Sequence, residues 1–464
     1  MNMTSRFSFL CLIVIVHTAG YPQGLPPKSF SDMKDVVQKL RETGLRNCES
    51  MVMLSELTSK APHRLSGSRG ADIAIDLTER MMKSHGVDNV HREPVDVPHW
   101  VRGDIEKASI IRSSQGHTIP IAICALGGSI ATPPKGLVAD VVEVRSFEEL
   151  KALGEKAKGK IVFFNRPMDP TQLQTRDAYK GAVNQRNLGA IEAGKAGAVA
   201  VLVRSMTLAL DRVPHTGTVN YADSVKKIPA AAVSTKDADL LSDLLKQEHG
   251  VSVRLKLSCQ ILPDVHSSNV IGEITGTEKP NEIIVVGAHL DDWDKGSGAH
   301  DDGAGCVQVI EALSLLKKLG IQPRRTIRAV LFMNEENGAR GAKAYPAAQE
   351  RKGESQIAAI ESDHGGFAPR GFSAEGDSTI YEKVIVWKPI FELLNAGEFT
   401  KGNSGTDLQP LVERGVAGFG LEPETHRYFD YHHSEHDTID KVNARELEMG
   451  AMAMALLSYI LSRM

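Results

Sequence analysis

A loop rich in glycine, aspartate and histidine is the first stretch of this sequence whose side chains could do chemistry. It reads GAHLDDWDKGSGAHDDGAG over residues 287–305 and continues directly from the apolar run EIIVVGA. Histidines and carboxylates grouped in this way are typical ligands of divalent cations. An EF-hand calcium loop fits poorly, because the twelfth residue from Asp292 is Gly303, where that loop requires glutamate.

Three further groups of polar residues follow apolar segments later in the chain. Glu335 and Glu336 come after AVLFMN, and Asp363 and His364 come at the end of AAIES. The last group is the histidine cluster YFDYHHSEHDT over residues 428–438. Each group alone is a weak signal, since a histidine at a strand end is more often structural than a ligand, and adjacent glutamates are common in solvated turns.

Taken together, the four groups predict a metal centre. Carboxylates and imidazoles gathered at successive strand ends carry a negative charge that is too costly to bury unless cations neutralise it. Histidine and carboxylate ligands without cysteine suit zinc in an open, catalytic coordination sphere. The ligand count fits two zinc ions that share one bridging acid, each with one histidine and one further acid, in a hydrolytic centre.

The segments that must position these groups have the pattern of an α/β fold. Nearly continuous apolar strands separated by helices favour a mostly parallel mixed sheet flanked by helices. In such sheets, ligands bind beyond the carboxyl ends of the strands, where the polar groups lie. The expected strands are 281–288, 326–334, 357–362 and 415–422, and the expected helices are 305–319, 338–350 and 444–463.

The middle of the chain has a different character. Short β-rich runs such as KASIIRS, GKIVFFN and AVAVLVRS are separated there by glycine and proline turns, with a few helices. We therefore expect a β-rich inserted domain over 99–263, between the two parts of a catalytic domain over 46–98 and 264–464. A chain of 464 residues is long enough for two domains.

The N-terminus predicts export from the cytoplasm. Arg6 precedes the apolar run FSFLCLIVIV, and small residues follow up to Gly20, which is typical of a cleavable signal peptide over 1–20. That run is too short to span a membrane, so we expect no membrane anchor. Residues 21–45 are either a removable propeptide or the first helix of the domain.

Charge and cysteine content exclude two classes of protein. The formal net charge is −4 and no dense lysine or arginine tract is present, so nucleic acid is not an expected partner. Four cysteines remain after the signal peptide, too few for a scaffold built on disulfides. At most two bridges could form among Cys48, Cys124, Cys259 and Cys306.

The motifs GAHLDDWD…GAHDDGAG, FMNEENGARGA, ESDHGG and YHHSEHDT, in this order, resemble those of the co-catalytic zinc exopeptidases. That family includes bacterial leucyl aminopeptidases and glutamate carboxypeptidases, and the resemblance spans nearly the whole mature chain. It implies two zinc ions, one held by His289 and Asp363 and the other by Glu336 and His433. Asp301 is implied as the carboxylate that bridges them.

The same resemblance implies catalytic roles for two more carboxylates. Glu335 becomes the general base that takes a proton as a metal-bridging hydroxide attacks the scissile carbonyl. Asp291, two residues after the first ligand, becomes the carboxylate that fixes the His289 imidazole tautomer. Cys306 is expected to be a packed thiol rather than a nucleophile.

The histidine cluster offers more than one candidate ligand. His433 is preferred because the family places Asp-Thr four and five residues after the ligand, as Asp437 and Thr438 are placed here. His432 and His436 are expected to line the pocket or lie at the surface. The segment GNSGTD at 402–407 and Tyr431 are candidate groups on the substrate side.

The resemblance also implies how the protein is made and used. It predicts a secreted or lysosomal enzyme that passes through the endoplasmic reticulum and Golgi, is made as a zymogen and works as a homodimer. Its expected activity is that of a carboxypeptidase on dipeptides and short peptides with unblocked termini. The runs KGKIVFFNR and AGKAGAVAVLVRS resemble the protease-associated domain inserted in secreted members.

Two other functions remain open from the sequence. The close alternative is an aminopeptidase of the same mechanism. The distant one is a non-enzymatic receptor ectodomain on the same fold, which predicts damaged metal ligands and a membrane anchor.

Overall fold

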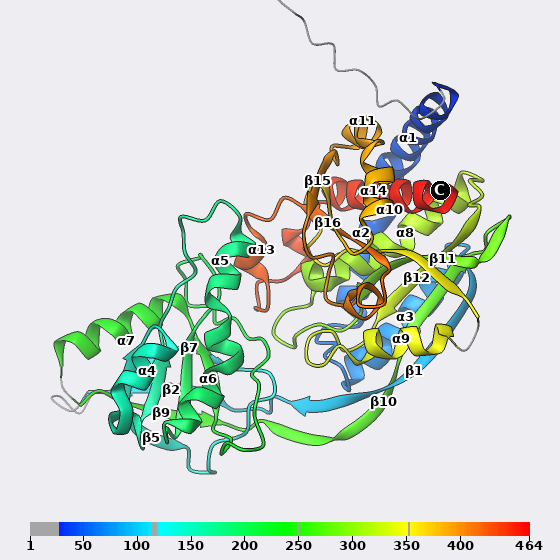
Figure 1. Ribbon diagram of the computed structural model, residues 1–464. Coiled ribbons are helices and arrows are strands. Elements are labelled where there is room, and N and C mark those ends of the chain that lie inside the picture. The colour runs from blue at the N-terminus through cyan, green and yellow to red at the C-terminus, as the bar shows by residue number, and fades with distance from the viewer. Residues whose placement is uncertain (1–26, 113–117, 249, 351–352) are drawn as a thin grey trace, which may run out of the picture.

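The computed structural model describes residues 27–112, 118–248, 250–350 and 353–464, which form two bodies side by side (Figure 1). The predicted signal peptide and residues 21–26 lie outside the described residues. Each body is built on a sheet of eight strands. Within the described residues, no helix is long and apolar enough to cross a membrane.

The larger body is a mixed sheet in the order β1-β10-β12-β11-β13-β16-β14-β15. Its four central strands, from β12 to β16, run parallel to one another, and the adjacent strands β10 and β14 run antiparallel to them. The predicted α/β class with a mostly parallel mixed sheet is thereby confirmed. The strands are β1 Asp88–Val101, β10 Gln260–Ile274, β11 Lys279–His289, β12 Arg325–Phe332, β13 Ser355–Glu361, β14 Pro369–Glu375, β15 Glu398–Lys401 and β16 Ala417–Pro423.

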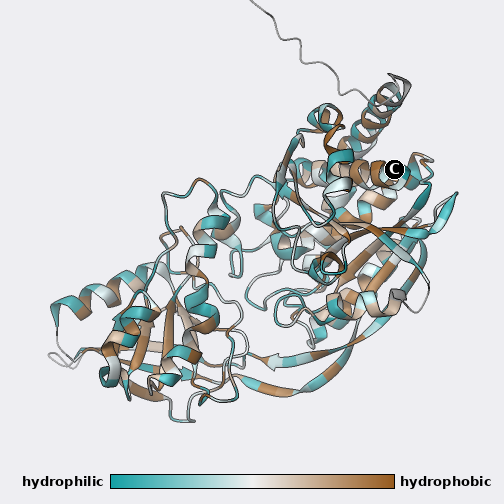
Figure 2. Cartoon of the chain, viewed as in Figure 1, coloured by the Kyte–Doolittle hydropathy of each residue, from teal (hydrophilic) through white to brown (hydrophobic). Residues whose placement is uncertain are grey.

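Helices cover both faces of this sheet, as expected for its central strands, which are apolar and buried along most of their length (Figure 2). Two of them, α8 and α14, pack on each other and are buried along most of their length. The methionine-rich α14 is core packing, as its composition predicts. The helices are α1 Pro27–Asn47, α2 Glu49–Lys60, α3 Arg69–Ser84, α8 Ala304–Lys318, α9 Arg340–Glu350, α10 Ser378–Ile385, α11 Lys388–Phe391, α12 Gln409–Val412, α13 Tyr428–Tyr431 and α14 Ala444–Arg463.

Most of the predicted propeptide region is helix α1. Its side chains Met33, Val37 and Leu40 are buried in the same core as α14. In this structure the segment therefore serves as the first helix of the larger body. Its removal during maturation remains a prediction.

The smaller body is a second mixed sheet, in the order β3-β2-β9-β5-β6-β7-β8-β4. Four α-helices accompany it, so the middle of the chain is less purely β than its runs suggest. Its strands are β2 Glu106–Ile111, β3 Thr118–Ile121, β4 Ile123–Ala125, β5 Leu137–Val144, β6 Ile161–Phe164, β7 Ala200–Arg204, β8 Ala230–Val233 and β9 Ser252–Leu257. Its helices are α4 Phe147–Leu153, α5 Thr175–Ala182, α6 Asn184–Lys195 and α7 Thr235–Gln247.

The antiparallel pair β1 and β10 runs from one body into the other (Figure 1). The predicted domain limits at 98/99 and 263/264 fall inside these two strands. A composition change cannot mark such a limit, because each strand continues through it. The similarity of the smaller body to a protease-associated domain stays a prediction.

The two bodies interlock at Trp293, which follows β11 in the glycine-rich loop. Its ring is buried in the core of the smaller body, 6.4 Å from the ring of Trp100. A methyl group built on Gly127 would lie 1.7 Å from this indole, so only glycine fits there. The loop that carries the candidate ligands is thus fastened into the second sheet.

Candidate metal centre

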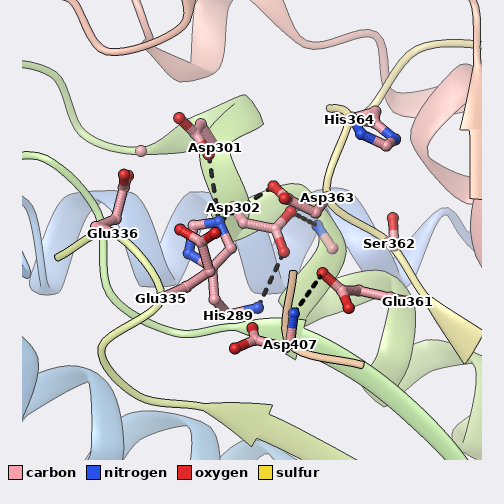
Figure 3. Close-up of polar contacts among 12 residues, drawn as sticks. His289, Asp301, Asp302, Glu335, Glu336, Glu361, Ser362, Asp363, His364 and Asp407 are labelled. Atoms are coloured by element: carbon pink, nitrogen blue, oxygen red, sulfur yellow. Dashed lines mark hydrogen bonds and ion pairs between the residues drawn. The ribbon is translucent and has the colours of Figure 1, made fainter. Parts of the chain in front are cut away.

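The predicted ligands meet at the carboxyl ends of the central strands of the larger sheet, and Figure 3 labels four of them, His289, Asp301, Glu336 and Asp363. His289 is the last residue of β11, Glu335 and Glu336 follow β12, and Asp363 follows β13. These three strands are parallel neighbours, so their carboxyl ends lie together. His433 reaches the same place from the segment after α13.

Asp301 lies between the two histidines. Its Oδ1 is 3.3 Å from Nε2 of His289, and its Oδ2 is 3.2 Å from Nε2 of His433. The same imidazole nitrogens lie 3.1 Å from Asp363 Oδ1 and 3.1 Å from Glu336 Oε2, respectively. One carboxylate that faces two histidines, each with a further acid, is the arrangement expected for two cations with a shared bridge.

The chemistry of these side chains fits divalent cations. Asp301 Oδ2 and Glu336 Oε1 are buried and make no hydrogen bond. Despite burial, which favours the neutral form, the carboxylates of Glu336 and Asp301 raise the pKa of His433 to about 10. Burial raises the pKa of Glu336 to about 8. These buried carboxylates therefore require a compensating positive charge to be stable in their ionised form, and metal ions supply it.

In its described ranges, the structure contains three groups of side chains whose ligand atoms lie close enough to bind one ion. These groups include the predicted ligands and two further residues. All five predicted ligands occur among them, within 4.8 Å of their group members, and Asp302 and His432 occur as well. His432 Nε2 lies 3.8 Å from Asp301, farther than His433. The geometry thus favours His433, as the spacing of Asp437 and Thr438 does.

Asp302 has a structural use for both of its oxygens. Oδ2 accepts the N–H of His289 at 3.1 Å, and Oδ1 accepts the N–H of Gly305 at 3.0 Å. This bonding holds the start of α8 against the end of β11. Both Asp302 oxygens are thus engaged with backbone N–H groups.

The other polar residues of the loop are structural as well. Asp292 forms a fully buried ion pair with Arg64, whose guanidinium also donates to the carbonyls of Leu290, Ser297 and Gly298. Asp294 forms an ion pair with Arg102, which directly follows β1. Because a buried ion pair is costly to break, Arg64 fixes the shape of the loop.

Asp291 supports the centre through different atoms from those predicted. The His289 Nδ1–H donates to the backbone carbonyl of Asp291 at 2.9 Å, so this carbonyl, and not the carboxylate, fixes the tautomer. The carboxylate Oδ1 instead accepts the N–H groups of Asn334 and Glu335, at 2.7 and 3.1 Å. Asp291 therefore ties the general-base candidate to the first histidine.

Glu335 lines the same cavity as the ligands. Burial raises its pKa to about 7, and the nearby carboxylates of Asp363, Asp291 and Asp301 add to the shift. Its neighbour Asn334 has a φ of 77°, a left-handed conformation that turns the chain sharply after β12. A carboxyl group that takes a proton readily beside metal ligands is suited to general-base work.

The cavity has a volume of about 390 Å³ and is lined by both bodies. Helices α5 and α6 of the smaller body form the wall opposite the ligands. Asn403 and Thr406 of the predicted segment GNSGTD line it, whereas Tyr431 stacks on His300 instead. Its lining residues also include Arg176, Tyr179, Arg186, Thr218, Tyr428 and Phe429.

Arg186 is one of the lining residues that the sequence does not single out. It is only 5% exposed, and no acidic partner is found for it in the part of the chain that the structure describes. Its guanidinium donates to Tyr179 Oη at 2.8 Å and lies over that ring, with Nη1 3.5 Å from His433 Nδ1. The backbone of Gly217 leaves room for it, since a methyl group there would lie 2.4 Å from the guanidinium carbon.

Cys48, Cys124, Cys259 and Cys306 carry free thiols in this structure. Cys306 is fully buried and its Sγ donates to the His289 carbonyl at 3.0 Å. Burial raises the pKa of this thiol well above its usual value, so it is not ionised. Its predicted role as a packed thiol agrees with this setting.

Comparison with known proteins identifies the family. The family model described as "Peptidase family M28" matches residues 269–458 of this chain. Carboxypeptidase Q of Bos taurus is 36% identical over 98% of this chain and 98% of its own, and that of Homo sapiens is 36% identical over 94% and 90%.

Solved structures show the same relationship. A peptidase M28 precursor from Shewanella amazonensis has a TM-score of 0.88 at 34% identity, over 93% of this chain and 97% of its own. A zinc aminopeptidase from Bacillus subtilis shares the fold, with a TM-score of 0.62 at 21% identity over 88% and 93%. Because the similarity covers nearly all of its length, the chain belongs to peptidase family M28 and is a peptidase, as its motifs predict.

Proposed function

We propose that the chain is a dinuclear zinc carboxypeptidase that hydrolyses dipeptides and short peptides with unblocked termini. One observation carries this proposal: Asp301 faces two histidines, each paired with a further acid, and Glu335 lies in the same cavity. The proposed ligands are His289, Asp301, Glu336, Asp363 and His433. The names of the carboxypeptidase Q relatives support the direction of cleavage.

The proposed mechanism divides the work between metal and protein. Zinc ions, when bound, polarise the scissile carbonyl and stabilise the negative charge that develops on its oxygen. Glu335 accepts the proton of the attacking water and passes it to the leaving nitrogen. Asp291 keeps Glu335 in place through its hydrogen bond to the Glu335 N–H.

Arg186 supports a substrate with a free carboxyl end. Three bonds separate the scissile carbonyl carbon from the carboxylate carbon of a leaving C-terminal residue, so the two lie within about 4 Å. The carboxylate of a dipeptide must therefore bind close to the metal ligands, as Arg186 does beside His433. A buried guanidinium that lacks an acidic partner is a suitable receptor for it.

The proposal includes a cellular route. The N-terminal pattern supports secretion or delivery to the lysosome through the endoplasmic reticulum and Golgi. We also propose a zymogen and a homodimer, on the strength of the motif resemblance.

Purified protein should contain two zinc ions per chain and should release amino acids from unblocked dipeptides. We expect chelation to abolish hydrolysis and added zinc to restore it, because the carbonyl is polarised by metal. Metal analysis and a dipeptide assay measure both. Protein without zinc, or without activity on any dipeptide, would contradict the proposal, and equal cleavage of dipeptides with capped carboxyl ends would favour an aminopeptidase.

Arg186→Gln should reduce the preference for a dipeptide over its C-terminal amide by about 10-fold or more, since a charged hydrogen bond contributes about 1.5–3 kcal/mol. The ratio of kcat/KM for the acid and the amide measures this preference. Arg176→Gln is the matched control, because Arg176 lines the same cavity but already pairs with Glu422. The assignment fails if Arg176→Gln, and not Arg186→Gln, reduces the preference.

A further inference from the structure

A segment of the smaller body, residues 215–218, contacts the backbone of Glu336 and His433. These two residues are the non-bridging ligands proposed for one of the zinc ions, called the second zinc ion below. The segment lies between β7 and β8, far in sequence from the motifs that supply the ligands. Thr218 Oγ1 donates to the carbonyl of Glu336 at 2.5 Å, and the N–H of Thr216 donates to the carbonyl of His433 at 2.9 Å. Both non-bridging ligands proposed for the second zinc ion are thus held from the smaller body.

The contact extends to the neighbouring histidine. The ring of His215, which is 1% exposed, donates from Nδ1 to the carbonyl of His432 at 2.7 Å. Groups of His215, Thr216 and Thr218 therefore form hydrogen bonds with the two ligand-bearing segments, after β12 and after α13.

The 215–218 segment is itself anchored within the smaller body. Thr216 Oγ1 donates to the carbonyl of Ala125 at 2.9 Å and accepts a hydrogen bond from Arg102 at 3.2 Å. The N–H of Gly127 donates to the carbonyl of Gly217 at 2.9 Å. The segment is therefore held in place by the smaller body, and its hydrogen bonds in turn fix the positions of the two metal ligands.

The backbone of His433 needs such support. Its φ is 60°, in the left-handed region, which is unfavourable for a residue with a side chain. Conformations of this kind persist where the surrounding structure holds them, as the N–H of Thr216 holds the His433 carbonyl. This turn aims the imidazole at Asp301 and Glu336.

The ligands of the first zinc ion are held differently. Asp302 accepts the N–H of His289, and Asp437 accepts the N–H of Asp301, the bridging ligand that both sites share, at 3.0 Å. These contacts belong to the larger body, whose loop and C-terminal segment supply both partners. The non-bridging ligands Glu336 and His433 are thus held from the smaller body, whereas His289 and the shared Asp301 are held within the larger body.

From this difference in how the ligands are held, we infer that the 215–218 segment, and Thr218 in particular, positions the ligands Glu336 and His433 of the second zinc site alone. The smaller body, on this inference, completes the metal centre as well as covering the substrate. The inference rests on the proposed two-zinc function. It concerns how Glu336 and His433 are held, and does not add a ligand.

Thr218→Val tests this inference, because it removes the hydroxyl and keeps the shape of the side chain. Zinc per chain is measured by metal analysis after dialysis of the full-length protein against graded free zinc. We expect one equivalent to bind as in the wild type and the other about 10- to 100-fold more weakly, the usual cost of losing a partner of a metal ligand. Excess zinc should restore hydrolysis.

Two further variants separate this role from a general effect on folding. Thr218→Ser keeps the hydroxyl and should bind both ions as the wild type does. Thr132→Val removes a similar hydroxyl, which donates to the Leu257 carbonyl at 3.2 Å inside the smaller body, and should also keep both ions. Equal affinity for both ions in Thr218→Val, equal weakening of both, or the same loss in Thr132→Val would overturn the inference.

The wild-type protein distinguishes the two possible failures. Fewer than two equivalents in the wild type would contradict the proposed two-zinc site, and this inference with it. Two equivalents in the wild type, with unchanged binding in Thr218→Val, would contradict the inference alone.

Discussion

Glu335→Gln should lower kcat for dipeptide hydrolysis by about 10²- to 10⁴-fold, the contribution usual for a general base. Glutamine has the same shape but cannot take the proton of the attacking water. Both zinc ions should remain bound, because the proposed ligand is the adjacent Glu336. Steady-state kinetics and metal analysis on the same preparation measure the two effects.

Glu311→Gln is the control for this substitution. Glu311 lies on α8, is 1% exposed, and burial raises its pKa to about 7, as for Glu335. It does not line the cavity, so its variant should keep the wild-type kcat. If Glu335→Gln were as active as the wild type, or lost its zinc, Glu335 would not be the base.

Asp301→Ala should remove both zinc ions and all measurable hydrolysis. Each oxygen of this carboxylate faces a different histidine, so one substitution takes a ligand from both proposed sites. By contrast, His433→Ala should weaken the binding of one ion only. Zinc titration by calorimetry measures the number of sites that remain.

The adjacent aspartate provides the comparison for Asp301. Asp302→Asn should keep two zinc ions and lower the free energy of unfolding, because the Asp302 oxygens bind backbone N–H groups. Loss of zinc from Asp302→Asn, with retention in Asp301→Ala, would exchange the roles of these two residues.

The sequence predicts the part of the site that depends on strand order. Polar residues after three apolar runs are expected to meet because parallel strands end at one edge, and His289, Glu336 and Asp363 do so. Asp301 and His433 come from irregular segments. Their placement came from the family resemblance, since no periodicity fixes it.

Other features had no signal in the sequence that could reveal them. The contacts of Arg186 and Thr218 with the site depend on how the smaller body packs against the larger one. The atom of Asp291 that binds His289 is a backbone carbonyl, which every residue possesses. The limits at 98/99 and 263/264 lie within strands whose residues suit both bodies.

The burial of Trp293 has a consequence for engineering the protein. A shortened enzyme without the smaller body would expose an indole that is now 3% accessible, and would free the loop that carries Asp291 and Asp301. The cut ends of β1 and β10 would also lose their continuation. The two bodies are therefore not interchangeable modules. A different domain inserted in place of the smaller body would need its own apolar site in which Trp293 is buried.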